Sequence, residues 1–219
     1  MSNIKLQDLT AIITGTSQYG AGYDTVHVET LLVTDEPISS EAAWYVPNGS
    51  TVPPAVLEIF KISNLKMYPQ SEATLLNGVD DIKQQALSGN LQEVINDSSR
   101  LLLLSILKKI QLNPVPSATN TYLLTYDYKL YPLDGVQVPT FEFQVLLPFD
   151  TLILSPGGRV QVTVLTPIGA KINQQETKGT VIPSNAELQE EVSVSSQSRR
   201  ATISFAYQND PEFVVKYNY

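Results

Sequence analysis

The sequence predicts a mainly β (α+β) fold, with an antiparallel β-sandwich or barrel-like core and a helical insertion at about residues 71–112. Apolar residues alternate with polar ones in several runs after residue 120, which is the period of a strand with one buried face. Between residues 80 and 110 the apolar spacing instead follows a helix. We expect one domain over residues 1–219, with an N-terminal β region at 1–70 and a C-terminal β region at 117–219.

The N-terminal β region contains one clear strand pattern. In "YDTVHVETLLVT", residues 23–34, the side chains of Val26 and Val28 share a face that His27 does not. The proline-rich segment 35–54 is expected to be mostly loop, with a possible helical turn at residues 40–44. Residues 55–68 are ambiguous, and we favour a strand because "LEIFKI" is compact and bounded by prolines.

The insertion is expected to contain short helices. Residues 80–87 fit one helix that Gly89 ends, and Asn90 followed by Glu93 resembles a capping box. The polar "NDSS" at 96–99 predicts an interruption before a second helix. Because residues 101–107, "LLLLSIL", are apolar nearly all round, a sheet or a neighbouring subunit should cover this helix on several sides. We expect Leu102 and Ile106 to be core residues.

The C-terminal β region is expected to form most of the core. Alternating runs occur at residues 121–131, 136–147, 201–207 and 213–219. In each run the alternation places the following residues on one face: Tyr122, Leu124, Tyr126, Tyr128, Leu130, Phe141, Phe143, Val145, Leu147, Ala201, Ile203, Phe205, Tyr207, Phe213, Val215, Tyr217 and Tyr219. The last strand should pair in a sheet, either its own or a partner's. Residues 173–199 read as a long polar loop that leads into a strand from Val192.

The stretch "TLILSPGGRVQVTVL", residues 151–165, predicts a hairpin. Pro156 has the fixed φ of the second position of a tight turn, and Gly157 tolerates the positive φ of the third. Val160, Val162 and Val164 would then form the inner face of the second strand.

Composition excludes several classes of function. The chain has 22 acidic and 14 basic residues and a net charge of -8, so a phosphate-binding groove for nucleic acid is not expected, and binding to anionic membranes by charge alone is disfavoured. It has no cysteine and one histidine, His27, which removes thiolate chemistry and metal sites with two imidazoles. No Sec signal and no transmembrane segment are visible.

No catalytic or cofactor motif is recognised. His27 lies in no G-x-S-x-G context, "GTSQYGAGYDT" lacks the residues of a phosphate loop, and no calcium loop surrounds Asp80 and Asp81. We therefore predict no enzymatic activity, no catalytic residues, no cofactor and no metal. The candidate interface residues are four aromatic residues, Trp44, Tyr45, Tyr217 and Tyr219, because such side chains often anchor interfaces.

The remaining function class is a non-enzymatic structural protein. The expected roles are a subunit of a homo-oligomer or of a mixed assembly, such as a capsid, decoration or tail component of a virion, or a filament, located in a virion or in the cytoplasm. The alternative is a β-rich binding or membrane-active module, such as a lectin or a pore-forming-like protein. An enzyme with an unrecognised carboxylate site is a third hypothesis.

Overall fold

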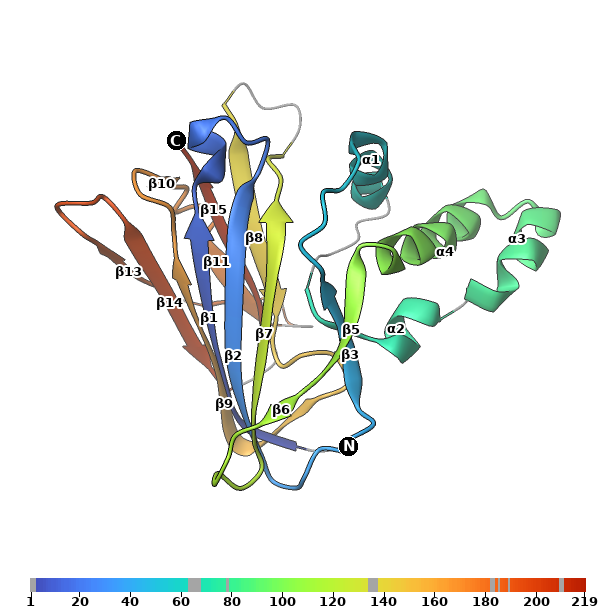
Figure 1. The fold of residues 1–219 in the computed structure, drawn as a ribbon, viewed down its shortest axis with the longest axis horizontal. Helices are drawn as coiled ribbons and strands as arrows, with labels where there is room; N and C mark the ends of the chain where they lie inside the picture. Colours follow the sequence, from blue (N-terminus) through green and yellow to red (C-terminus); the bar gives the residue numbers. More distant parts are fainter. Residues whose placement is uncertain are drawn as a thin grey trace.

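A computed structural model describes residues 3–62, 68–77, 79–133, 138–181, 184, 186–188, 190–208 and 211–219. It confirms a mainly β fold with antiparallel sheets and a helical insertion. Two sheets stack on each other, and the helices lie to one side of them (Figure 1).

The larger sheet has seven strands within these described residues, in the order β13-β14-β9-β1-β2-β7-β6. Its strands are β1 (Asn3–Thr14), β2 (Asp24–Thr34), β6 (Asn113–Pro114), β7 (Thr121–Leu130), β9 (Ile153–Leu165), β13 (Glu191–Val194) and β14 (Ala201–Tyr207). Neighbours are antiparallel except for β1 and β9, which are parallel. Because β13 and β6 are edge strands, this sheet is open.

The smaller sheet is built around the C-terminal strand. β15 (Pro211–Asn218) pairs along one edge with β8 (Thr140–Leu146) and along the other with two short strands, and a further short strand pairs with β11. These short strands are β10 (Lys171–Ile172), β11 (Lys178–Val181) and β12 (Glu187–Leu188). The C-terminal strand therefore pairs within its own chain. The segment predicted as a long loop contains strands β11 and β12, and β13 lies where a strand from Val192 was expected.

The core lies between the two sheets, where the alternating residues face inward. The larger sheet contributes Val26, Tyr126 and Val162, and the smaller sheet contributes Phe143 and Val215, all at most 2 % exposed. These residues belong to the sets that the period-two pattern placed on a common face of each strand. In β9, Val160 and Val164 are buried as expected, which follows from the same alternation.

The predicted hairpin at "SPGG" is wrong, because β9 continues through these residues as one strand. Ile4 pairs with Leu154 and Leu6 with Arg159, so residues 155–158 bulge out of the ladder with β1. Gly157 has the expected positive φ, 77°. A Cβ at Gly158 would lie 2.6 Å from the carbonyl oxygen of Ile4, so only glycine lets the backbones approach there.

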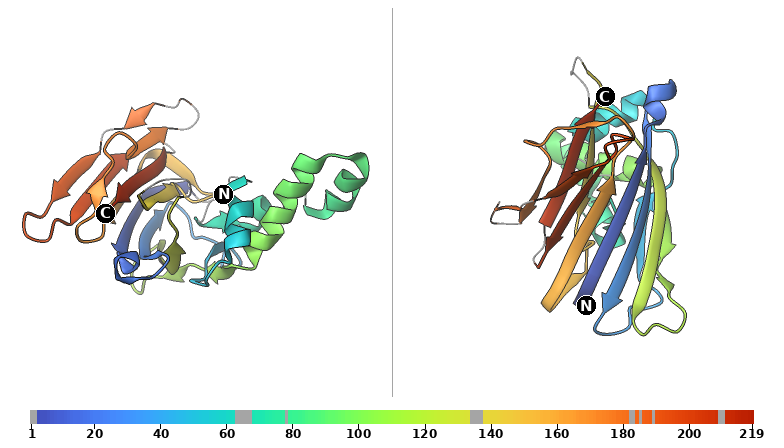
Figure 2. Two further views of the ribbon diagram at one scale, coloured as in Figure 1. Left: turned by 90° about the horizontal axis from the view of Figure 1, so that it is seen from above. Right: turned by 90° about the vertical axis from the view of Figure 1, so that its left-hand side faces the viewer.

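The insertion begins after β3 (Ala43–Pro47) and ends at β5 (Leu107–Gln111), its antiparallel neighbour. Between them lie α1 (Pro54–Ile62), β4 (Gln70–Ser71), α2 (Glu72–Leu76), the 3-10 helix η2 (Val79–Asp81), α3 (Ile82–Ser88) and α4 (Leu91–Leu104). Among the described residues, β3 and β5 belong to a third, separate sheet of order β4-β3-β5 beside the sandwich. We call the described residues from 48 to 106 the helical arm. Seen from above, α4 and α3 project away from the sandwich (Figure 2).

One sequence prediction for the region around the first helix is wrong, and a second is met only in part. The favoured strand at 55–68 is helix α1 as far as Ile62, and residues 63–67 lie outside the described residues. Short apolar runs fit either period, so length and flanking prolines alone did not settle the choice. The considered helical turn at 40–44 is only a single turn, closed by the Ala42 amide bonded to the Ser39 carbonyl at 3.0 Å, because β3 begins at Ala43.

Helix α4 is continuous through "NDSS". Asn90 caps it as predicted, accepting a hydrogen bond from the Glu93 amide at 3.5 Å. Two of the polar residues that suggested an interruption, Asp97 and Ser99, are buried and bonded: Gln85 Nε2 donates to Asp97 Oδ2 at 2.8 Å, and Ser99 Oγ donates to the Ile95 carbonyl. Local bonds of this kind let short polar residues sit inside a helix.

The end of α4 differs from the prediction. The helix stops at Leu104, so the segment 101–107 is only partly helical and passes into β5. Ile106 is buried as expected, but Leu102 is 37 % exposed while Leu103 is fully buried. The predicted core position was therefore off by one residue, which on a helix turns the side chain by about 100°.

Candidate functional site

An exposed apolar surface on the helical arm is the first candidate for a functional site. Leu91, Ile95, Leu101 and Leu102 of α4 are exposed, with 71 % of Leu91 accessible to solvent. Leu87, at the end of α3, is 81 % exposed. Single exposed leucines are ordinary, whereas a group of them on one element points to a contact surface.

Helix geometry places these residues on one side of α4. With 3.6 residues per turn, positions 91, 94, 95, 98, 101, 102 and 105 fall on one face. We call this face the α4 stripe; its residues are Leu91, Val94, Ile95, Ser98, Leu101, Leu102 and, just after the helix, Ser105. None of them is charged.

The opposite side of α4 packs inside the arm. Leu103 lies in a small core with Val52, Phe60, Leu75 and Ile106, which is separate from the sandwich core. Helix α4 is thus apolar on two sides, and the arm covers only one of them. We expected this helix to be covered on several sides, but within the described residues only its inner side is covered.

Of the four predicted interface residues, two lie in the interior. Trp44 is 2 % exposed, and its Nε1 donates to the Asp150 carbonyl oxygen at 3.0 Å. Tyr217 is fully buried in β15. Tyr45, in contact with the Lys109 ammonium, and Tyr219 are half-buried, and their role at an interface stays a prediction.

Trp44 lies where the arm joins the sandwich. The backbone amide of Ser71, which caps α2, donates to Asp150 Oδ2 at 2.9 Å. Burial alone would raise the pKa of Asp150, but hydrogen bonds from Ser71 and Thr74 outweigh it and hold this pKa below its ordinary value. Asp150 therefore stays charged and links the helical arm to the sandwich as a hydrogen-bond acceptor.

A second polar cluster surrounds Asp24, at the start of β2. Its Oδ1 accepts bonds from the amide of Ser17 at 3.0 Å and from the hydroxyl of Ser17 at 2.6 Å. Its Oδ2 accepts the hydroxyls of Tyr217 and Tyr219, each at 2.6 Å. Burial, together with the hydrogen bonds to Asp24, raises the pKa of both tyrosines above the ordinary value.

The geometry of this cluster fits a structural role. Asp24 is fully buried, and four donors from two distant parts of the chain satisfy its oxygens. Gly15 leaves room for the Tyr219 hydroxyl, since a Cβ there would lie 2.5 Å from it. No local pattern indicated this cluster, because Tyr217 and Tyr219 lie more than 190 residues after Asp24.

His27 lies on the outer face of the larger sheet, as predicted, beside a hollow of about 240 Å³. Its Nδ1 is 2.7 Å from Oδ1 of Asp127 on the neighbouring strand β7. Lys129 also lines the hollow, although its ammonium is bonded to Thr51 and lies over the Tyr23 ring. The described lining contains no serine, so a Ser–His–Asp arrangement is not assembled there.

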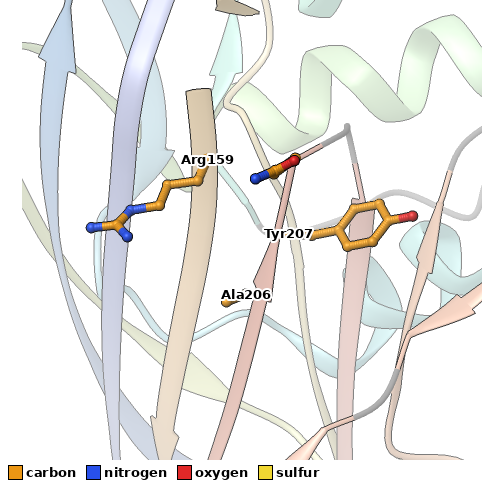
Figure 3. A pocket seen from close by; sticks show the side chains of 4 residues that line it. Arg159, Ala206 and Tyr207 are labelled. Carbon is orange, nitrogen blue, oxygen red and sulfur yellow. The ribbon is translucent and has the colours of Figure 1, made fainter. Parts of the chain in front are cut away.

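A larger hollow, of about 380 Å³, lies at the end of β9 and β14. It is lined by Arg159, Ala206, Tyr207 and Gln208. Arg159 and Tyr207 point in opposite directions (Figure 3), so their polar groups do not converge on one ligand position. A binding site needs such convergence, which makes this hollow a weak candidate.

Other predicted features bring no chemistry together. Among the described residues, no group of three or more histidine or acidic side chains is placed to hold a metal ion, and Asp80 and Asp81 lie in η2. None of the helices in the described ranges has both the length and the apolar character to cross a bilayer. Neither a protein-family model nor a curated protein matches the chain.

Proposed function

We propose that the chain is a non-enzymatic structural protein that assembles with copies of itself, as a subunit of a larger particle such as a virion component or a filament. One observation carries this proposal: four large apolar side chains of the α4 stripe are exposed, none of its residues is charged, and it lies on an arm that projects from the sandwich (Figure 2). Exposed apolar patches of this kind mark contact surfaces.

The charge distribution supports the same function. A net charge of -8 makes separate copies repel each other, which favours solubility over random association. The α4 stripe carries no charge, so it can be covered without removing an ion from water. An acidic body with an uncharged contact surface associates through that surface rather than through its other faces.

The test is light scattering after size-exclusion chromatography, over protein concentrations from about 1 µM to 1 mM, the range of weak to moderate association. We expect the wild type to associate and the Ile95→Gln/Leu102→Gln double variant to dissociate with unchanged circular dichroism. Ile168→Gln is the matched control, since Ile168 is 59 % exposed and lies outside the arm. A wild type that stays monomeric throughout this range would overturn the proposal.

A second candidate function is a binding module for a small polar ligand, favoured by the hollow beside His27. Its His27–Asp127 pair and Lys129 supply donors and acceptors, and Ile12 adds an apolar wall. At about 240 Å³ it lies below the roughly 300–1,000 Å³ of typical ligand sites, which suits a ligand no larger than one sugar ring. Calorimetric titration with monosaccharides tests it; heat that disappears in His27→Gln would support it, and no heat with any of them would reject it.

A further inference from the structure

We infer that two copies of this chain pair through their α4 stripes as antiparallel helices, with a two-fold axis beside Ser98. This inference rests on the proposed assembly function and names its contact. It follows from the order of residues along the stripe, from the charges around it and from the direction of the arm.

The positions of the stripe are spaced symmetrically before and after Ser98. In an antiparallel pair centred there, positions equally far before and after residue 98 face each other, as a two-fold interface requires. Leu91 then meets the partner's Ser105, Val94 meets the partner's Leu102, and Ile95 meets the partner's Leu101. Each of these contacts occurs twice, so the surface is complementary to itself.

The side-chain sizes fit this arrangement. Ser98 meets the partner's Ser98 at the crossing point, where small side chains let two helices approach to about 8 Å. The longer side chains Val94, Ile95, Leu101 and Leu102 lie to either side of the crossing. A parallel pair would instead place Leu91 against the partner's Leu91 and Ser105 against the partner's Ser105, which leaves a bulky end and an underpacked end.

Charged side chains do not oppose the pairing. Arg100 projects from the other side of α4, where Nη1 lies 3.5 Å from Oδ1 of Asp97 and donates to the Asn77 carbonyl. In the antiparallel pair the positive N-terminal end of each helix dipole also lies beside the negative C-terminal end of the other. Pairing therefore buries apolar and hydroxyl groups but no unpaired ion.

The direction of the arm separates the two acidic bodies. The C-terminal end of α4 leads into β5 at the sandwich, whereas its N-terminal end and α3 point away (Figure 1). Antiparallel pairing places the two sandwiches at opposite ends of the helix pair. A parallel pair would bring two bodies of net charge -8 to the same end, which Coulomb repulsion disfavours.

Membrane binding is a poorer fit to the same stripe. Helices that lie on membrane surfaces combine an apolar face with Lys and Arg on the polar face. In α4 the only basic residue is Arg100, and it is already bonded within the arm. A second copy of the chain matches the stripe better than an anionic lipid surface does.

Cysteine cross-linking tests the pairing directly, because the chain contains no cysteine of its own. Oxidised Ser98→Cys should form a disulfide-linked dimer, since facing positions near a helix crossing come within the roughly 4.4–6.8 Å between Cα atoms that a disulfide spans. Ser105→Cys alone should not cross-link, but mixed with Leu91→Cys it should form a heterodimer. Cross-linking of Ser105→Cys alone would show a parallel pair and overturn the inference.

Adding Ile95→Gln/Leu102→Gln to Ser98→Cys distinguishes stripe pairing from random collision. We expect the cross-linking rate to fall by about tenfold or more, as loss of interface anchors does. An unchanged rate would overturn the inference. Circular dichroism of each variant, compared with Ser98→Cys alone, checks that the arm stays folded.

Light scattering on the wild type separates this inference from the proposed function. Association of the wild type without cross-linking of Ser98→Cys would reject the antiparallel pair and leave assembly standing. A monomeric wild type without cross-linking would reject both. Monomers that co-sediment with vesicles of 70 % phosphatidylcholine and 30 % phosphatidylserine, a composition of about 30 % anionic lipid, would assign the stripe to a membrane surface instead.

Discussion

Removing the hydroxyl of Tyr217 tests the hydrogen-bonded cluster around Asp24. Tyr217→Phe keeps the ring, which stacks on Phe141 with centroids 5.3 Å apart, and deletes only the donor to Asp24 Oδ2. Hydrogen bonds to charged groups contribute about 1.5–3 kcal/mol, and the buried site admits no replacement from bulk water. Because Tyr219 still donates to the same oxygen, we expect a loss of about 2 kcal/mol in the free energy of unfolding.

A double-mutant cycle isolates this bond from other effects. Asp24→Ala leaves four donors without their acceptor and should cost about 3–5 kcal/mol. The double variant should lose about 1–2 kcal/mol less unfolding free energy than the sum of the two single-variant losses, because the bond can be lost only once. Urea unfolding followed by circular dichroism measures all three variants, with Tyr19→Phe, at a 91 % exposed position, as the control. Strict additivity would refute the proposed bond.

Three further predictions concern stability. Because the pKa values of Tyr217 and Tyr219 are raised in the folded protein, their contribution to the free energy of unfolding is complete below the ordinary pKa of about 10. Above that pH the free energy of unfolding should fall, because the unfolded chain loses these protons first. Urea midpoints between pH 8 and 11.5 check this, and a smaller fall is expected in Tyr217→Phe. Gly158→Ala should lower the melting temperature, because the added methyl meets the backbone of β1; Gly22→Ala, at an open position, should not, and equal melting temperatures would contradict the bulge geometry. Leu103→Ala should cost about 2–5 kcal/mol and Leu102→Ala under about 1 kcal/mol in chemical unfolding, so the reverse order would contradict the orientation of α4.

Strands with one solvent-exposed face were predictable, because the alternation of apolar and polar residues is a local feature of the sequence. In β7 and β15 every second residue is apolar, and those residues are the ones that the core buries. The cap at Asn90 was predictable for the same reason, since its partner Glu93 lies three residues away. Signals of this kind need no knowledge of what the segment packs against.

Two of the wrong predictions depend on partners outside the segment itself. "SPGG" has the composition of a turn, but its bulge exists because β9 pairs with β1, about 150 residues earlier in the chain. "NDSS" has the composition of a helix boundary, but Gln85 on another helix bonds Asp97 and keeps α4 intact. Local composition cannot report such contacts.

The candidate site was predictable only in outline. The apolar residues around 101–107 predicted a helix that a sheet or a neighbouring subunit should cover, yet the exposed side could not be identified from the period alone. Leu102 and Leu103 are the same residue type, and only the packing of α1 and α2 against α4 decides that Leu103 is buried. Trp44 and Tyr217 were predicted at an interface because they are large aromatic residues with a polar group. In the fold the same properties place them in the interior, where each makes a hydrogen bond.

The arm begins and ends at one point of the sandwich, and this has a consequence for folding. Pro47 pairs with Leu107, and the Asn48 amide donates to the Ile106 carbonyl at 3.0 Å. Contacts inside the arm join residues between 48 and 106, whereas the pairings of β1 with β9 and of β2 with β7 close loops of about 100 residues or more. Local contacts form faster than such distant ones. The arm can therefore open and close as a cooperative unit of its own, and its amide protons should exchange with solvent at a free energy distinct from that of the sandwich.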